Sequence, residues 1–277
     1  MGRLLPFDRP LSLHHLTALD ATPAELVGIA AAVDCSRVCL FTYVPDEARH
    51  LFPMVTMDMR AEVAAALARA GVRLHNIEVF PLTLDADLKA FRSGLEVGAV
   101  LGAARATAHV HIEDEGQAID AFGRFCDLAA EYRLAVGLEF NAFSKARTVT
   151  SAAAIVRGAA RANGDIALDL LHAVRSGATP SDVVAVALLI GYAQICDGPP
   201  TIPRESRWRE AIEERALPGE GAFPIAAMLA ALGANVVIDV EVPQVHAMRA
   251  GVPAIQRARR AIEAARRFAN GVVDAHT

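Results

Sequence analysis

The sequence predicts a single-domain α/β protein, a (β/α)8 TIM barrel that spans residues 1–277. Three observations predict this fold. Short apolar runs alternate with longer amphipathic runs eight times along the chain. Several of the short runs, such as residues 135–138 (AVGL), are apolar almost throughout, which is typical of parallel strands covered on both faces. Eight βα units in 277 residues also match the usual size of this barrel, roughly 250 residues.

An open doubly wound sheet is the alternative fold. That fold usually opens with a glycine-rich turn between its first strand and first helix. Here the corresponding turn, residues 16–23, contains no glycine. The closed barrel is therefore favoured. We expect its eight strands at residues 12–16, 37–41, 73–80, 105–112, 135–140, 165–170, 190–196 and 235–242.

The helices between these strands carry recognisable end signals. Thr22 precedes Pro23 and is followed three residues later by Glu25, the pattern of a capping box at a helix start. The next helix, residues 61–70, ends at Gly71, a typical stop residue. We expect the remaining helices at residues 88–101, 117–132, 151–162, 181–188, 224–232 and 253–269.

Composition limits the function classes. Apolar residues make up 53% of the chain, which supports a large core, and no uncharged apolar run is long enough to span a membrane. The net charge of −5 gives no basic surface for nucleic acid or an anionic membrane. The four cysteines form neither a CxxC pair nor a zinc spacing, and the N-terminus does not read as a signal peptide. We expect a cytoplasmic protein with reduced cysteines.

Four polar residues lie near the ends of the last four predicted strands, each among apolar neighbours: Glu139, Asp169, Gln194 and Glu241. In a closed barrel they converge on one rim, the rim where such barrels build their active sites. Three carboxylates and an amide oxygen favour Mn²⁺ or Mg²⁺ over Zn²⁺. Pairing of each carboxylate with a nearby arginine or lysine is the alternative. Asp239 competes with Glu241, but Glu241 lies nearer the strand end.

Other residues are candidates for substrate contacts. His172 follows Asp169 by three residues and is a candidate proton donor. His75 and His109, on the third and fourth strands, are assigned to the substrate-binding set, with a hydrogen-bonded core histidine as the alternative for each. The long loops after the seventh strand, residues 197–207 and 217–223, add Arg204, as a carboxylate or phosphate anchor, and Glu220. Solvated charge and helix capping are their respective alternatives.

At these residues the chain resembles the xylose-isomerase-like TIM-barrel superfamily, which includes sugar phosphate isomerases and epimerases, ketose 3-epimerases, inosose dehydratases and 3-dehydroshikimate dehydratases. The segments LEFNAFS, LDLLHAVRSG, YAQICDGP, PGEG and VEVP carry the resemblance, which covers roughly residues 10–270. It implies one divalent metal ion held by Glu139, Asp169, Gln194 and Glu241. Many members have histidine where this chain has Gln194; a similar glutamine occurs in some dehydroshikimate dehydratases. The resemblance also implies that His172 contacts a substrate oxygen.

Endonuclease IV shares the fold, but it needs additional histidine ligands and a DNA-binding surface that this acidic chain lacks. The sequence contains neither a P-loop nor GxGxxG, so we expect no nucleotide cofactor. The expected metal is Mn²⁺ or Mg²⁺, with Co²⁺ or Zn²⁺ as alternatives.

The predicted function is that of a metal-dependent isomerase or epimerase acting on a sugar or another small polyhydroxylated carbonyl compound. Glu241 removes the proton next to a metal-bound carbonyl, Glu139 acts as the partner acid or base, and an enediolate-like intermediate forms. A dehydratase or lyase, with His172 protonating the leaving hydroxyl, is the first alternative. A non-catalytic sugar-binding barrel or partner subunit is the second. A homo-oligomer is compatible with the sequence.

Overall fold

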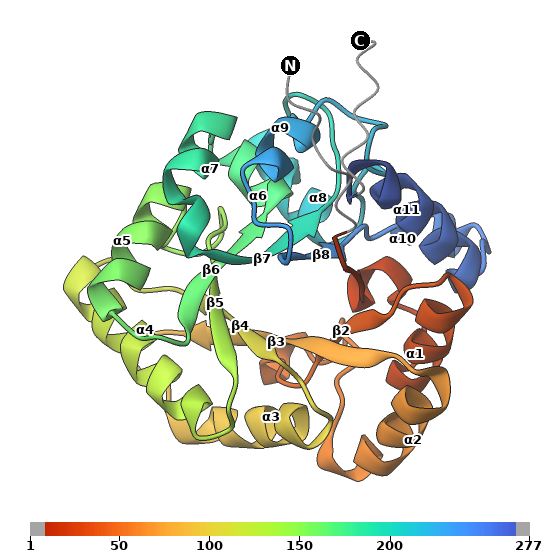
Figure 1. Cartoon of the computed structure of the whole chain (residues 1–277), viewed down its shortest axis with the longest axis horizontal. Helices are drawn as coiled ribbons and strands as arrows, with labels where there is room; N and C mark the ends of the chain where they lie inside the picture. The colour runs from red at the N-terminus through yellow and green to blue at the C-terminus, as the bar shows by residue number, and fades with distance from the viewer. Residues whose placement is uncertain (1–8, 270–277) are drawn as a thin grey trace.

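Eight parallel strands pair in sequence order and close into a barrel, with β8 beside β1 (Figure 1). This computed structural model describes residues 9–269 of the chain. The fold prediction is confirmed. The strands are β1 (Leu11–His14), β2 (Arg37–Phe41), β3 (Arg73–Leu82), β4 (Arg105–Val110), β5 (Ala135–Glu139), β6 (Gly164–Asp169), β7 (Ile190–Ile195) and β8 (Val237–Val240).

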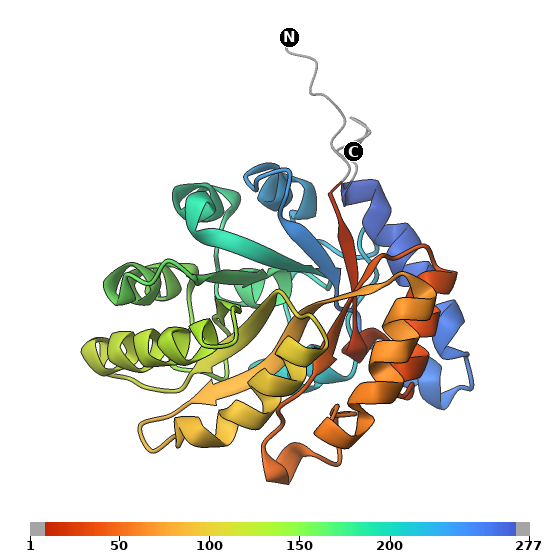
Figure 2. The same cartoon turned by 60° about the horizontal axis from the view of Figure 1, so that its bottom comes forward.

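Helices surround the strands on the outside of the barrel, as Figures 1 and 2 show. Within residues 9–269, no helix combines the length and the apolar character needed to cross a membrane. The α-helices are α1 (Pro23–Ala32), α2 (Arg60–Ala70), α3 (Leu88–Val100), α4 (Glu115–Ala130), α5 (Val149–Ala159), α6 (Leu170–Arg175), α7 (Pro180–Val186), α8 (Arg207–Ile212), α9 (Ile225–Ala230), α10 (Val245–Arg249) and α11 (Ala254–Ala269).

The predicted end signals of the helices are confirmed. The Thr22 hydroxyl accepts a hydrogen bond from the Glu25 backbone N–H, and the Glu25 carboxylate accepts one from the Thr22 N–H, so α1 begins with a full capping box. Gly71 ends α2 with φ of 63°, the left-handed conformation that glycine adopts without strain.

Three short helices, α6, α8 and α10, were not predicted. Each has only five or six residues, too few for a helical period to show in the sequence. Helix α6 begins directly after β6 because the Asp169 carboxylate accepts the Leu171 N–H at 2.6 Å and caps the helix. The sixth predicted strand, residues 165–170, therefore ends one residue early, at Asp169.

The main apolar core lies between the strands and the surrounding helices. The space enclosed by the strands, by contrast, holds many polar side chains. Asn76 on β3 donates hydrogen bonds to Thr107 Oγ1 at 2.9 Å and Glu78 Oε1 at 2.9 Å, and it contacts Cys39 Sγ at 3.3 Å. This polar interior places titratable groups directly against the pocket described next.

Candidate functional site

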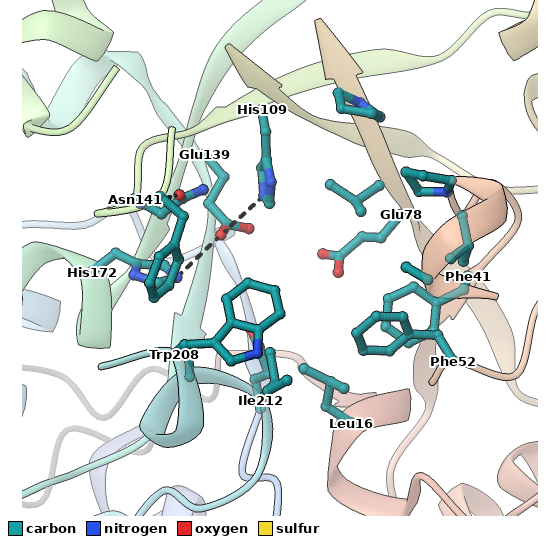
Figure 3. A pocket seen from close by; sticks show the side chains of 18 of the residues that line it. Leu16, Phe41, Phe52, Glu78, His109, Glu139, Asn141, His172, Trp208 and Ile212 are labelled. Atoms are coloured by element: carbon teal, nitrogen blue, oxygen red, sulfur yellow. Dashed lines mark hydrogen bonds and ion pairs between the residues drawn. The ribbon is translucent and has the colours of Figure 1, made fainter. Parts of the chain in front are cut away.

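A pocket of about 250 Å³ opens at the carboxyl-terminal ends of the strands, where TIM barrels build their active sites. Its mouth is walled mainly by apolar and aromatic side chains, and its polar groups face inward from the strand ends (Figure 3). The lining residues that carry the argument below are Phe41, Phe52, Glu78, His109, Glu139, Phe143, His172, Trp208, Arg215 and Glu241.

The structure brings together most of the predicted site residues. Glu139, His172, His109 and Glu241 line the pocket. Asp169 and Gln194, which end neighbouring strands and pair with each other in register, are buried next to it, with exposures of 0% and 1%. The predicted convergence of the last four strands on one rim is therefore found.

Glu139 is the centre of a carboxylate–histidine group. Its Oε1 lies 3.2 Å from His109 Nε2 and 3.6 Å from His172 Nε2, the contacts drawn in Figure 3. His172 Nε2 also lies 3.7 Å from Asp169 Oδ2. One ligand atom from each of Glu139, Asp169 and His172 lies within 4.8 Å of the others, so these three residues form a group that could hold a metal ion. The sequence placed His172 with the substrate rather than among the ligands.

Burial and charge act in opposite directions on these two histidines. Burial alone lowers the pKa of His109, but the negative charge of Glu139 more than offsets it, so the pKa of His109 is raised. For His172 burial prevails over Asp169 and Glu139, and its pKa is lowered. His172 is therefore held in the neutral form, which has a lone pair for a cation or a substrate proton.

Arg215, which the sequence analysis did not single out, joins two of the predicted ligands. Its Nη1 donates to Asp169 Oδ2 at 2.9 Å and its Nη2 donates to Glu241 Oε1 at 2.6 Å, with the residue only 5% exposed. Pairing with an arginine, the alternative to metal binding, is therefore found for Asp169 and Glu241. Glu139, the third rim carboxylate, has no such arginine among the described residues. Arg215 follows the charged run EE in a loop, which reads as a solvated segment. Only the need of buried carboxylates for a counter-charge pointed to such a residue.

Two buried oxygens of the predicted ligand set have no partner among the described residues. Gln194 donates its Nε2 to Glu78 Oε1 at 3.2 Å, which leaves Gln194 Oε1 without a hydrogen bond. Glu241 Oε2 is equally unpartnered, because Arg215 binds only Oε1. Buried acceptors of this kind are costly unless a donor or a cation meets them.

The donor set therefore fits a divalent metal ion. Gln194 and Glu241 each offer a free oxygen, Asp169 and Glu139 offer carboxylates with unused lone pairs, and His172 offers a neutral ring. Arg215 pairs with two of the three carboxylates, yet burial raises the pKa of Glu241 well above its usual range, so a bound cation would favour the ionised form of Glu241. Asp169 keeps its negative charge, because the Arg215 guanidinium outweighs burial and holds the pKa of this carboxyl below its usual range.

Three residues of the predicted substrate-binding set lie away from the pocket. His75 packs against the Tyr192 ring inside the barrel, with ring centroids 5.6 Å apart. Burial and the charge of Arg105 lower the pKa of His75 to about 3, so it stays neutral as a core histidine. Arg204 and Glu220 are both exposed, in a 3-10 turn and in the PGEG loop, and neither lines the pocket.

The chain belongs to the family described as "Xylose isomerase-like TIM barrel", whose profile matches residues 28–270. Among solved structures, the IolI protein with a bound zinc atom superposes with a TM-score of 0.76 at 17% identity, covering 96% of this chain and 99% of that chain. No protein with curated function matches the sequence.

Two further similar structures are those of a probable dehydratase and an epimerase. The probable 3-DHS dehydratase AsbF from Bacillus anthracis has a TM-score of 0.71 at 13% identity, covering 92% of this chain and 98% of that one. A D-allulose 3-epimerase from Methylomonas sp. has a TM-score of 0.69 at 15% identity, covering 97% and 100%. At these identities the likeness shows the shared fold.

Proposed function

We propose that this protein is a divalent-metal-dependent enzyme that isomerises or epimerises a small polyhydroxylated carbonyl compound. The observation that carries the proposal is the pair of unpartnered buried oxygens, Gln194 Oε1 and Glu241 Oε2, beside Glu139, Asp169 and His172 at a substrate-sized pocket. The oxygen-rich set favours Mn²⁺ or Mg²⁺, and His172 makes Co²⁺ and Zn²⁺ suitable alternatives.

A metal ion held there supplies Lewis-acid polarisation of a substrate carbonyl. The chain's own residues then move the proton. Arg215 anchors Glu241 by Oε1, and the unpartnered Oε2 has two lone pairs, so it could lie against the ion and still take the proton from the carbon next to the carbonyl. Glu139, held by His109 and His172, is placed to return a proton to the neighbouring carbon or to the opposite face. The first outcome is isomerisation and the second is epimerisation.

The walls of the pocket keep a dehydratase as the second candidate. Phe143 and Trp208 pack edge to face on one side, with ring centroids 5.1 Å apart. The ring centroids of Phe41 and Phe52 lie 5.1 Å apart on the other side. Such walls suit the apolar face of a cyclic substrate. His109, whose raised pKa favours the protonated ring, lines the same space and is placed to protonate a departing β-hydroxyl, whereas the neutral His172 must first accept a proton. The similarity in fold to IolI, the dehydratase and the epimerase is compatible with either reaction class.

Solvent deuterium exchange tests the proposal directly. The purified protein, loaded with Mn²⁺, is incubated in D2O with ketoses, inososes and 3-dehydroshikimate, and incorporation at the carbon next to the carbonyl is measured by NMR. We expect exchange with at least one substrate, and a loss of roughly 100-fold or more in Glu241→Gln. Glu205→Gln, an exposed glutamate outside the pocket, is the matched control and is expected to keep the wild-type rate.

Elimination without return of the proton, seen as loss of water from the substrate, would replace the isomerase proposal with the dehydratase. Trp208, the single tryptophan of the chain, lies at the pocket, so its fluorescence reports substrate binding separately from turnover. A substrate that changes this fluorescence but undergoes neither exchange nor elimination would favour the non-catalytic binding barrel.

A further inference from the structure

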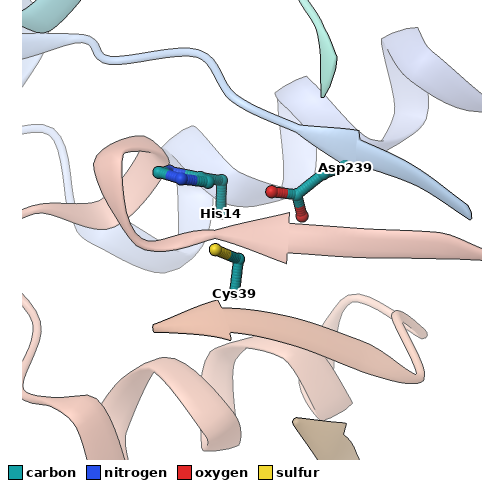
Figure 4. Close-up of side chains that lie close together, drawn as sticks. All are labelled: His14, Cys39 and Asp239. Atoms are coloured by element: carbon teal, nitrogen blue, oxygen red, sulfur yellow. The ribbon is translucent and has the colours of Figure 1, made fainter. Parts of the chain in front are cut away.

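A second group of metal-ligating side chains lies inside the barrel, outside the set proposed above. His14 on β1, Cys39 on β2 and Asp239 on β8 lie close together (Figure 4). One ligand atom from each lies within 4.8 Å of the others. The three residues, which we call the interior cluster, are buried, with exposures of 0%, 1% and 0%.

The carboxylate of Asp239 is the unpartnered group of the interior cluster. Neither of its carboxylate oxygens has a hydrogen-bond partner among the described residues, although the side chain is fully buried. An ionised carboxylate in that position is costly unless a cation or a donor compensates it. Its nearest neighbours across the strands are Ser12 on β1 and Gln194 on β7, both uncharged. The nearby group that can carry positive charge is His14, whose pKa is raised well above its usual range because the charge of Glu78 outweighs burial, and that ring is already paired with Glu78. A bound cation, or a proton on Asp239, would compensate the carboxylate directly.

We propose that His14, Cys39 and Asp239 bind a second divalent metal ion of the zinc type. A thiolate, an imidazole and a carboxylate are the ligand types that Zn²⁺ takes at about 2.0–2.3 Å. The metal site proposed above, which we call the rim site, consists of Glu139, Asp169, His172, Gln194 and Glu241. Its ligand atoms are oxygens and one imidazole nitrogen, whereas the interior cluster adds a sulfur, which favours a softer ion.

Glu78 connects the interior cluster to the pocket. Its Oε2 lies 2.7 Å from His14 Nε2, and the same residue lines the pocket, so Glu78 adjoins both the cluster and the pocket. His14 Nδ1 accepts the Leu16 N–H at 3.1 Å. An ion at Nδ1 displaces this contact and keeps Glu78 at Nε2, whereas an ion at Nε2 displaces both contacts, because the ring proton then lies on Nδ1. In either case Glu78 remains next to the ion, as acceptor for the other ring nitrogen or as the fourth ligand.

Binding must release protons for the charges to balance. The Cys39 thiol loses its proton to become a ligand, the His14 ring releases the proton of the nitrogen that takes the ion, and Asp239 binds as the anion. The thiolate and the carboxylate together supply two negative charges to the divalent ion, while Glu78 stays paired with the His14 ring or joins the ion. No electron is transferred, so the step needs no oxidant or reductant.

Cobalt titration tests this inference, because a Co²⁺–thiolate bond gives a near-ultraviolet charge-transfer band that oxygen and nitrogen ligands do not give. The full-length protein is stripped with a chelator and titrated with Co²⁺. We expect the band to saturate at about one equivalent, with about two ions bound per chain when the rim site is also filled. In Cys39→Ser the band disappears and about one ion remains.

Two variants serve as controls. Cys196→Ser removes the buried thiol near the rim, 3.7 Å from Arg215, and is expected to keep the band. Asp169→Asn weakens the rim site and is expected to keep the band as well, so failure of the proposed function and failure of this inference are distinguishable. Asp239→Asn, which keeps the shape of the side chain, is expected to weaken the thiolate-linked binding at least about 10-fold, and it replaces Cys39→Ser if that variant does not fold.

The inference is overturned if wild-type protein shows no thiolate band with excess Co²⁺, or if the band is lost in Cys196→Ser and retained in Cys39→Ser. The first result would mean that the interior cluster does not bind a metal ion through Cys39. The second would place the sulfur ligand at the rim.

Discussion

At the scale of single residues, Arg215 decides how the rim site is charged. Its guanidinium holds Asp169 and Glu241 by one oxygen each, at 2.9 and 2.6 Å, and it leaves Glu241 Oε2 free. The same residue thus stabilises two buried carboxylates and orients one of them. An apolar side chain in place of Arg215 would leave the carboxylates of Asp169 and Glu241 without this partner.

Arg215→Met is therefore expected to destabilise the chelator-treated protein by about 3–5 kcal/mol, the usual cost of breaking a buried ion pair from one side. Urea unfolding with chelator measures it. Added Mn²⁺ should restore part of the loss, because the metal supplies positive charge to the same carboxylates. The exposed Arg204→Met is the control, with an expected change within about 0.5 kcal/mol. Equal stability of Arg215→Met and wild type in chelator would contradict this role.

His15 is a buried histidine whose titration affects stability. It has 0% exposure, its Nε2 lies 2.9 Å from the Ala21 carbonyl, and burial lowers its pKa to about 4. The unfolded chain, with a histidine pKa near 6.5, binds this proton more readily, so the free energy of unfolding falls as the pH drops from about 6.5 toward 4. At low pH, protonation of His15 lowers the free energy of unfolding by at most about 3 kcal/mol.

Unfolding of His15→Gln, whose amide can still donate to Ala21, is expected to depend less on pH over this range. The measurement is urea unfolding at several pH values. The exposed His50→Gln serves as control and should keep the wild-type slope. Parallel curves for His15→Gln and wild type would show that other groups cause the acid destabilisation.

At the scale of elements, the ends of strands and helices show where sequence patterns suffice. The pattern located β2 at its observed bounds and α1 at its capping box, because these signals are local. The eighth strand was predicted at residues 235–242 but spans Val237–Val240. Glu241 therefore follows the strand and turns into the pocket. Strand length depends on the neighbouring ladders, which a single segment does not encode.

Two helix glycines give a matched test of packing between elements. A Cβ at Gly94 in α3 would lie 2.8 Å from the Thr42 carbonyl oxygen and 3.1 Å from Tyr43 Cβ, whereas a Cβ at Gly28 in α1 would meet nothing within 4 Å. We expect Gly94→Ala to destabilise by about 1–3 kcal/mol and Gly28→Ala to stabilise by about 0.5–1 kcal/mol. Thermal and urea unfolding of the two variants measure both changes in the free energy of unfolding. A stabilised Gly94→Ala would contradict the close approach of α3 to the barrel.

At the scale of the whole molecule, metal binding at the proposed rim site would stabilise the barrel. Its proposed ligands come from β5, β6, α6 and β7 and from Glu241, which directly follows β8, so a bound ion would join half of the barrel circumference. An ion that binds only the folded state at 100 times its dissociation constant adds about 2.7 kcal/mol of stability. Chelation is expected to lower the melting temperature of the wild type accordingly. A Glu139→Gln/Asp169→Asn double variant should lose most of this shift, and an unchanged shift in that variant would show that the rim is not where the stabilising ion binds.

The sequence by itself determined the eightfold βα alternation, the closed barrel and the rim positions of Glu139, Asp169, Gln194 and Glu241. Those features follow from hydrophobic periodicity and from the geometry of parallel strands, which are local or repeated properties of the chain. Only the tertiary structure decided that Arg215 lies between two of the rim carboxylates and that His172 joins Glu139 and Asp169. It also decided that His14, Cys39 and Asp239 meet inside the barrel, and that His75, Arg204 and Glu220 stay outside the pocket. The physical reason is that side-chain partners distant in sequence are chosen by packing and charge compensation in three dimensions, which no spacing along the chain records.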